Sequence, residues 1–153
     1  MAVVEAVCIS TKKGVPKKAI EQAEFQVGFG IVGDAHGGTW HRQVSLLAGE
    51  SIDRVKERLP GLKDGAFAEN VITRGVNLLA VKVGDRVRIG TEILLEVTQI
   101  GKKCHNQGCA IKKATGDCIM PREGVFAKVL EGGAVKSGDK VAVLSEGAQD
   151  TLD

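Results

Sequence analysis

The sequence predicts a mainly β protein, a barrel of short strands with one or two short helices. Its 20 glycines and 3 prolines indicate many tight turns, which suit short strands better than long helices. Short apolar or alternating segments recur along the chain, as expected of strands with a buried face. One stretch has the three- and four-residue apolar spacing of an amphipathic helix. A closed or nearly closed barrel is favoured because closure leaves no exposed strand edge.

The expected strands are short and rich in β-branched or alternating residues. They cover residues 3–9, 24–31, 43–48, 68–74, 86–89, 92–100, 125–130 and 140–144. The helix is expected to begin near residue 50, because Ile52, Val55 and Leu59 recur from there with charged residues between them. It should end before Pro60, which cannot continue a helix in its interior.

The 153 residues are expected to form a single domain over residues 3–144, followed by a flexible polar tail at 145–153. The formal net charge of +2 and an aromatic content of 3% argue against a nucleic-acid partner. No apolar run is long enough to span a membrane and residues 1–10 do not resemble a signal peptide, so we expect a cytoplasmic protein with no membrane partner. Thiols stay reduced there, so each cysteine is interpreted as a packed residue, a metal ligand or a reactive thiol.

The loop after the second expected strand is the first segment that could carry chemistry. It places Asp34, His36, Trp40, His41 and Arg42 within nine residues. Polar side chains on a loop held between strands are a frequent binding arrangement. The two histidines are five residues apart and do not share a helical face, so a zinc site is only weakly supported. The alternative is that His41 and Arg42 merely cap or pair at the surface.

Two further segments hold candidate polar residues. Glu69 and Asn70 are neighbours in a strand-like pattern, so their side chains are expected on opposite faces, with one of them inside or in a cleft. That residue either makes a structural hydrogen bond or contacts a ligand. Arg122 precedes an apolar strand, and its planar guanidinium could hold a phosphate or an acidic group. The alternative for Arg122 is a surface ion pair worth little.

Cys104 is the predicted reactive residue. It follows an apolar strand and lies among several cationic or ionisable side chains, namely Lys102, Lys103, His105, Lys112 and Lys113. Nearby cations stabilise a thiolate, which is both the nucleophile and the soft metal ligand. Such a thiol suits molybdenum or sulfur-transfer chemistry. The alternative, an ordinary buried cysteine, fits this polar setting poorly, whereas Cys8 is expected in the core and Cys118 in a structural role.

Together these segments resemble the MOSC domain, found at the C-terminus of molybdenum-cofactor sulfurases, in its stand-alone bacterial form. The residues that carry the resemblance run in the expected order: Gly33-Asp34-Ala35-His36, the segment HRQVSLL from His41, Phe67-Ala68-Glu69-Asn70, the turn Val83-Gly84-Asp85, Cys104, and MPREGVF from Met120. The resemblance implies a mostly β, barrel-like fold and a link to the molybdenum cofactor, a pterin dithiolene that carries a phosphate.

The resemblance also implies roles for individual residues. Cys104 would carry sulfur or ligate molybdenum, and the residues lining the same cleft would be Asp34, His36, Arg42, Asn70 and Arg122. The sequence has neither the lysine-bearing sulfurase domain nor the companion barrel of larger relatives. It therefore cannot extract sulfur from cysteine by that route, and its CHNQGC segment carries a second cysteine, Cys109, that the one-cysteine pattern does not need.

Three functions follow as hypotheses. The first is a protein that binds the molybdenum cofactor, or carries sulfur for it or for a molybdoenzyme. Cys104 would act there, while Arg42, Arg122 and lysines such as Lys103 neutralise the phosphate and His36 or His105 positions a proton. The second is a small cofactor-dependent reductase of N-oxygenated substrates with an external electron donor, because no flavin, haem or iron–sulfur motif is present. The third is a module in which Cys104 and Cys109 bind zinc or sense oxidants. The sequence leaves open whether the protein is an enzyme.

Overall fold

The computed structural model describes residues 2–13, 15–101 and 123–144, and within them eleven strands, one α-helix and one short 3-10 helix. The mainly β prediction is confirmed. Eight strands form one sheet, in the spatial order β11 (Val141–Leu144), β7 (Arg86–Ile89), β8 (Ile93–Ile100), β9 (Val125–Glu131), β5 (Val44–Ala48), β6 (Val71–Arg74), β1 (Val3–Ile9) and β2 (Lys18–Ile20). Three strands form a second sheet, in the order β10 (Gly133–Lys136), β3 (Gln22–Gln26) and β4 (Gly30–Ile31).

The sequence predicts a closed or nearly closed barrel, and the large sheet is not closed, because it ends at β11 on one side and at β2 on the other. Strand β1 pairs with β6 along one edge. Its other edge contacts two different segments of the chain. Its second half pairs there with β2, while only Val3 forms a bridge to Lys140, just ahead of β11. The backbone N–H of Val4 also donates to the Asp139 carbonyl, at 2.8 Å. The N–H of Gly138 donates to the Val4 carbonyl and the N–H of Val141 to the Ala2 carbonyl, so residues 2–4 and 138–141 contact each other over a short stretch.

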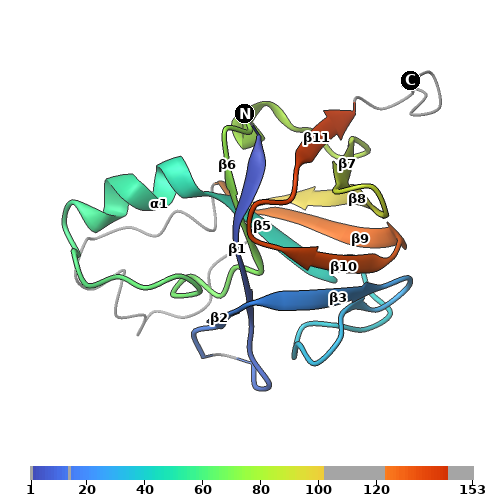
Figure 1. Ribbon diagram of the computed structural model, residues 1–153, viewed down its shortest axis with the longest axis horizontal. Helices are drawn as coiled ribbons and strands as arrows, with labels where there is room; N and C mark the ends of the chain where they lie inside the picture. The colour runs from blue at the N-terminus through green and yellow to red at the C-terminus, as the bar shows by residue number, and fades with distance from the viewer. Residues whose placement is uncertain (1, 14, 102–122, 145–153) are drawn as a thin grey trace.

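Strand β5 lies in the middle of the sheet and is buried on both faces. It pairs antiparallel with β9 and parallel with β6. Leu46 belongs to the core shared with the small sheet, whereas Leu47 belongs to a second core. That second core lies under α1 (Gly49–Lys56), which Figure 1 shows projecting to one side of the strands. Alternate side chains of β5 therefore serve two cores, and all five of its residues are buried.

Several predicted boundaries need correction. The single strand expected over 24–31 is two strands, β3 and β4, since Gly28 turns the chain with a φ of 74°. The strand expected from residue 68 begins only at Val71, because Ala68 has a φ of 64° and lies outside extended backbone. The helix is α1, and it ends at Lys56. Strands β2 and β10 and the 3-10 helix Leu78–Ala80 were not predicted.

Candidate functional site

A pocket of about 160 Å³ opens where the loop before β5 meets the starts of β5 and β9. The residues that line it are His36, Trp40, Arg42, Ser45, Ala68, Asn70 and Phe126. Three predicted site residues, His36, Arg42 and Asn70, thus come together from two segments that lie far apart in the sequence. The parallel pairing of β5 with β6 brings those two segments side by side.

Arg42 lies between two aromatic rings of this pocket. Its guanidinium carbon is 4.7 Å from the centre of the Trp40 ring and 5.8 Å from that of Phe126. Cation–π contacts of this kind hold a guanidinium in place without neutralising its charge. Its buried Nε has no hydrogen-bond partner among the residues that the structure describes. A buried N–H without an acceptor is costly, so this atom is a candidate for contact with an acceptor atom of a ligand.

Trp40 joins this arginine to a second cation. Lys13 Nζ lies 5.7 Å from the centre of the same ring, and Trp40 Nε1 donates to the His36 carbonyl at 2.8 Å. The indole is therefore fixed at one end by a hydrogen bond and contacts two positive side chains. The rim of the pocket that Trp40 forms is electropositive.

A buried ion pair lies beneath the loop. Lys17 Nζ is 2.7 Å from Asp34 Oδ1 and 2.9 Å from His36 Nδ1, and both charged side chains are almost fully buried. Asp34 also accepts hydrogen bonds from the backbone N–H groups of Ser10 and His36. Asp34 is not among the residues that line the pocket, and its contacts hold the loop that carries His36.

Asn70 lines the pocket but is engaged in structural hydrogen bonds. Its Oδ1 accepts from the backbone N–H of Ser45 at 2.9 Å, and its Nδ2 donates to the Cys8 carbonyl at 3.1 Å. Its own backbone N–H donates to Ser45 Oγ at 3.0 Å. The side chain therefore ties β1 and β5 to the start of β6, which is the structural alternative that the sequence left open.

Glu69 and Asn70 were expected within a strand, but both precede β6, and both side chains are buried. The Glu69 carboxylate accepts hydrogen bonds from the backbone N–H groups of Gly65 and Phe67, each at 2.9 Å. Burial raises the pKa of Glu69 above its ordinary value, although these N–H groups act in the opposite direction. Glu69 thus stabilises the turn that leads into the pocket wall.

Cys8 is a core residue, as predicted. It is fully buried, and burial raises the pKa of its thiol to about 12, with a further contribution from the nearby Glu69 carboxylate. A thiol with so high a pKa holds almost no thiolate at neutral pH, so it is a poor nucleophile. Cys8 is therefore not a competitor for the reactive role predicted for Cys104.

Four predicted site residues, Lys103, Cys104, His105 and Arg122, lie outside the described residues. The chain on either side of their segment is placed beside the pocket. Gly101 N–H donates to the Gly124 carbonyl at 2.7 Å, and Gln99 pairs with Phe126, which lines the pocket.

Lys17, Ser45 and Phe126 were not predicted as parts of the site. Lys17 belongs to a basic turn of several lysines, and no local pattern distinguishes it from Lys18, which is exposed. Phe126 begins an apolar strand and resembles any core residue in the sequence. Ser45 lies within the apolar strand β5, and its hydroxyl was the only feature of the sequence there that could have indicated a site residue. No group of three metal-ligating side chains occurs within the described ranges.

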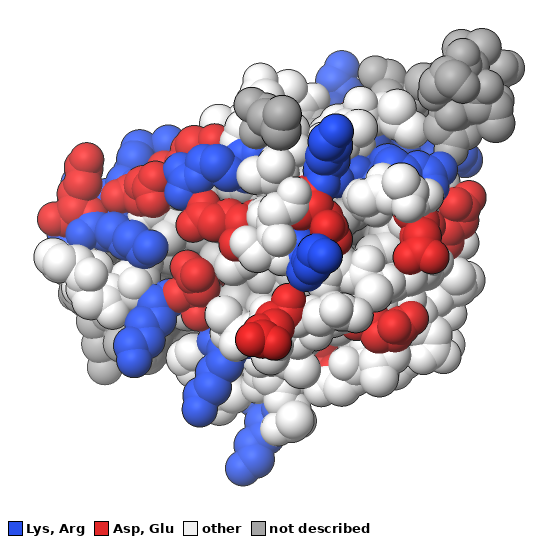
Figure 2. All heavy atoms as spheres, in the orientation of Figure 1, with Lys and Arg blue, Asp and Glu red and all other residues white. Residues whose placement is uncertain are grey.

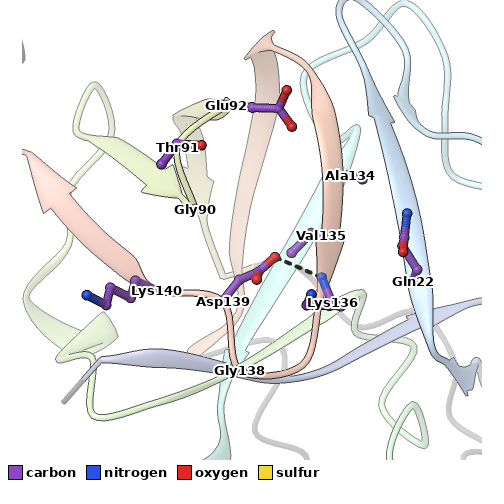
Figure 3. Close-up of a pocket in the computed structure, with 10 residues that line it drawn as sticks. All are labelled: Gln22, Gly90, Thr91, Glu92, Ala134, Val135, Lys136, Gly138, Asp139 and Lys140. Carbon is purple, nitrogen blue, oxygen red and sulfur yellow. Dashed lines mark hydrogen bonds between the residues drawn. The ribbon is translucent and has the colours of Figure 1, made fainter.

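A second cavity, of about 530 Å³, lies between β3, β10 and the turn that joins β7 to β8 (Figure 3). None of the predicted site residues lines it. Its carboxylate Asp139 accepts a hydrogen bond from the backbone N–H of Lys136, at 2.9 Å, and so stabilises the turn after β10. Of the predicted site residues, His36, Arg42 and Asn70 line the smaller pocket instead.

Charge on the surface is mixed. Figure 2 shows lysine and arginine interspersed with aspartate and glutamate on the face in view, with no large region of one sign. Several of these charges are paired, among them Arg74 with Asp53 at 2.7 Å. This face therefore lacks the single-sign field that would draw a polyanion. In the described part of the chain, no helix is long and apolar enough to cross a membrane.

The family model of the MOSC domain matches residues 33–142. This span covers most of the chain, so the protein belongs to the MOSC domain family, which is associated with molybdenum cofactor metabolism. The match includes the pocket loop, β5, β6 and the segment that contains Cys104.

Several solved structures have folds similar to that of this chain. The YuaD protein from Bacillus subtilis has a TM-score of 0.77 at 22% identity, covering 95% of this chain and 97% of that one. YiiM from Geobacillus stearothermophilus has a TM-score of 0.68 at 16% identity, covering 97% and 77%. YiiM from Escherichia coli also has a TM-score of 0.68, at 18% identity, covering 96% and 72%. At these identities the likeness concerns the fold alone. No curated protein matches the sequence.

Proposed function

We propose that the protein binds the molybdenum cofactor, or carries sulfur destined for it, with Cys104 as its reactive residue. The observation that carries the proposal is the buried, unpartnered Nε of Arg42 in a pocket next to the flanks of the Cys104 segment. The link to molybdenum cofactor metabolism comes from membership of the MOSC family. The site supplies a guanidinium whose buried Nε lacks an acceptor.

The described residues fit the anionic end of this cofactor. A pterin dithiolene with a phosphate requires positive charge and N–H donors, and Arg42 and Lys13 supply the charge on two sides of Trp40. The pocket of about 160 Å³ is smaller than the ~300–1,000 Å³ of most small-molecule sites. The described walls would therefore hold a phosphate-sized group and not the entire ligand.

Each residue has a distinct role in this proposal. Arg42 donates hydrogen bonds and charge to the anionic group, and His36 offers a ring nitrogen at the same wall. Arg122 and Lys103 add positive charge, and His105 serves as a second candidate for positioning a proton. When bound, the cofactor would supply electron-transfer chemistry at molybdenum. Cys104 either ligates this metal as a thiolate or holds sulfur as a persulfide received from a donor protein.

Elemental analysis of protein purified from a host that makes the cofactor tests the proposal. Molybdenum and zinc are measured for the wild type, Cys104→Ser and Arg42→Met, together with intact mass. We expect molybdenum, or a mass increase of one sulfur, in the wild type and its loss in Cys104→Ser. Arg42→Met should lower the molybdenum content about tenfold or more, since a hydrogen bond to a charged group is worth about 1.5–3 kcal/mol.

Lys82→Met is the control, because Lys82 is exposed in the turn before β7 and does not line the pocket. It should leave the molybdenum and sulfur content unchanged. A wild type with neither molybdenum nor added sulfur would overturn the proposal. Stoichiometric zinc would instead support the zinc-binding module. If molybdenum is present and turnover of an N-oxygenated substrate depends on an added electron donor, the protein is a reductase that uses the same site.

A further inference from the structure

The buried Lys17 has no role in the function proposed above. Its side chain is 1% exposed, and its ammonium contacts the Asp34 carboxylate and the Nδ1 atom of His36. Removing an ammonium group from water is expensive, and a buried ion pair often adds little net stability compared with an apolar packing. The ammonium of Lys17 is therefore better explained by its effect on His36 than by its contribution to stability.

The contact decides which nitrogen of His36 carries the proton. A lysine ammonium has three N–H donors and no acceptor, so at 2.9 Å the Nδ1 atom of His36 must accept. In a neutral imidazole one nitrogen accepts and the other donates, and the proton is then on Nε2. If Nδ1 carried the proton, the N–H of His36 and the ammonium of Lys17 would be two donors facing each other at hydrogen-bond distance, with no acceptor between them.

We infer that Lys17 is a positioning residue of the pocket, which holds His36 in the tautomer with its proton on Nε2. Nε2 of His36 is then a hydrogen-bond donor, as is the Nε of Arg42, and both residues line the pocket. Both donors suit an oxyanion, such as a phosphate group or molybdate. The inference about the ligand rests on the proposed function, whereas the tautomer follows from the contacts alone.

The surroundings of Lys17 keep its ammonium in this position. Its backbone N–H donates to the Gly65 carbonyl at 2.8 Å, and Gly65 approaches so closely that a Cβ atom there would be 2.0 Å from the Lys17 carbonyl oxygen. Asp34 is itself fixed by the backbone N–H groups of Ser10 and His36. Lys17, Asp34 and His36 are thus held by backbone contacts from three separate segments.

The tautomer of His36 can be measured by long-range ¹⁵N–¹H NMR correlation, with His36→Gln used to assign the signal. In the wild type we expect an unprotonated Nδ1 and a protonated Nε2. Lys17→Met would leave the Asp34 charge buried, so the double variant Lys17→Met/Asp34→Asn removes both charges and keeps the fold testable. In it the tautomers of His36 should mix. Lys18→Met, at the exposed neighbouring lysine, is the control and should leave the wild-type signal unchanged.

Anion binding provides the second readout, through the fluorescence of Trp40, the one tryptophan of the chain. Inorganic phosphate and molybdate are titrated separately, which distinguishes a phosphate site from a metal oxyanion site. The double variant should bind the preferred anion about tenfold more weakly, the value of one lost charge-assisted hydrogen bond. A wild-type proton on Nδ1, or unchanged tautomer and affinity in the double variant, would overturn the inference. A wild type with the expected tautomer but no response to either anion would count against the proposed function and leave the effect of Lys17 on His36 standing.

Discussion

Three buried polar residues around the pocket have three different physical roles. Asn70 has its hydrogen bonds satisfied by protein atoms and therefore stabilises the structure. The ammonium of Lys17 has its hydrogen bonds satisfied by Asp34 and His36, and it orients the His36 imidazole. Arg42 retains a buried donor without a protein acceptor among the described residues. The number of satisfied hydrogen bonds, more than residue type, thus separates structural residues from a candidate ligand contact.

Cys104 should alkylate faster than Cys8 in the native protein near neutral pH. Burial raises the pKa of Cys8 to about 12, so its thiolate is scarce and inaccessible, whereas the sequence surrounds Cys104 with cations. Peptide mapping after brief iodoacetamide treatment measures the order of modification. Modification of Cys8 or Cys118 before Cys104 would show that the reactive residue is misassigned.

The same pKa shift has a consequence for stability. A thiol whose folded pKa is raised above its unfolded value stays protonated in the folded protein while the unfolded chain ionises. The stability that Cys8 contributes is therefore fully present below pH 9.0 and is lost as the pH rises from there toward about 12. In urea denaturation, Cys8→Ala should reduce this alkaline loss of stability relative to the wild type. If the free energy of unfolding depended on pH identically in both proteins, the raised pKa of Cys8 would be contradicted.

Asn70→Ala should destabilise the fold by about 2–4 kcal/mol. The substitution leaves the Ser45 N–H and the Cys8 carbonyl without their buried partner, and each orphaned group costs about 1–3 kcal/mol. Chemical denaturation measures the loss. Asn77→Ala is the matched control, since Asn77 is exposed and makes no side-chain cap hydrogen bond. Equal stabilities of the two variants would assign Asn70 to the ligand and not to the structure.

At the scale of elements, the turn before β6 connects the buried lysine with the pocket wall. The Glu69 carboxylate accepts from the Gly65 N–H, and the Gly65 carbonyl accepts from the Lys17 N–H. Asn70 then follows directly and contacts β1 and β5. The conformation of this turn therefore fixes both the position of Lys17 and one side of the pocket.

Gly65→Ala should be strongly destabilising. Gly65 has a φ of +90°, and an added Cβ would lie 2.0 Å from the backbone oxygen of Lys17, an atom that cannot move aside cheaply. We expect a loss of more than about 1 kcal/mol, measured by chemical denaturation. Gly61→Ala provides the control, because a Cβ there would meet nothing within 4 Å. A Gly65→Ala protein as stable as Gly61→Ala would show that the turn does not have this conformation.

At the scale of the whole molecule, the order of the strands places the site. Strands β5 and β9 are neighbours in the large sheet although β6, β7 and β8 come between them in sequence. Their starts bring together Ser45 and Phe126, and the parallel partner β6 brings Asn70. The site is thus assembled by long-range pairing in the middle of the sheet, where both faces are covered.

Truncation tests the predicted domain limits of residues 3–144. A chain that ends at Leu144 should melt within about 2 °C of the full-length protein, because only the predicted tail is lost. A chain that ends at Lys140 lacks β11, so β7 keeps only its pairing with β8, and Val87 and Ile89 become more exposed. Its melting temperature should fall by several degrees, measured by circular dichroism. A large loss on removal of the tail alone would extend the domain beyond residue 144.

Local pattern accounts for what the sequence predicted well. The strands β1, β5, β7, β8, β9 and β11 and the helix α1 have clear apolar periodicity or β-branched runs, and their predicted limits differ from the observed ones by a few residues. Strand β2, with the residues KAI, and strand β10, with GAVK, are too short and too polar to produce such a pattern. Their backbone conformation depends on the partner strands β1 and β3.

The amino-acid sequence alone was sufficient to predict the mainly β class, the MOSC family and the concentration of polar residues in the loop before β5. These properties are local, because they depend on residue type and short-range spacing. The three-dimensional fold was needed to show that the sheet does not close, that Asn70 hydrogen-bonds to Ser45 and Cys8, and that Lys17, not Lys18, is buried beside His36. Burial and hydrogen-bond partners depend on segments far apart in the chain, and no short-range pattern contains them.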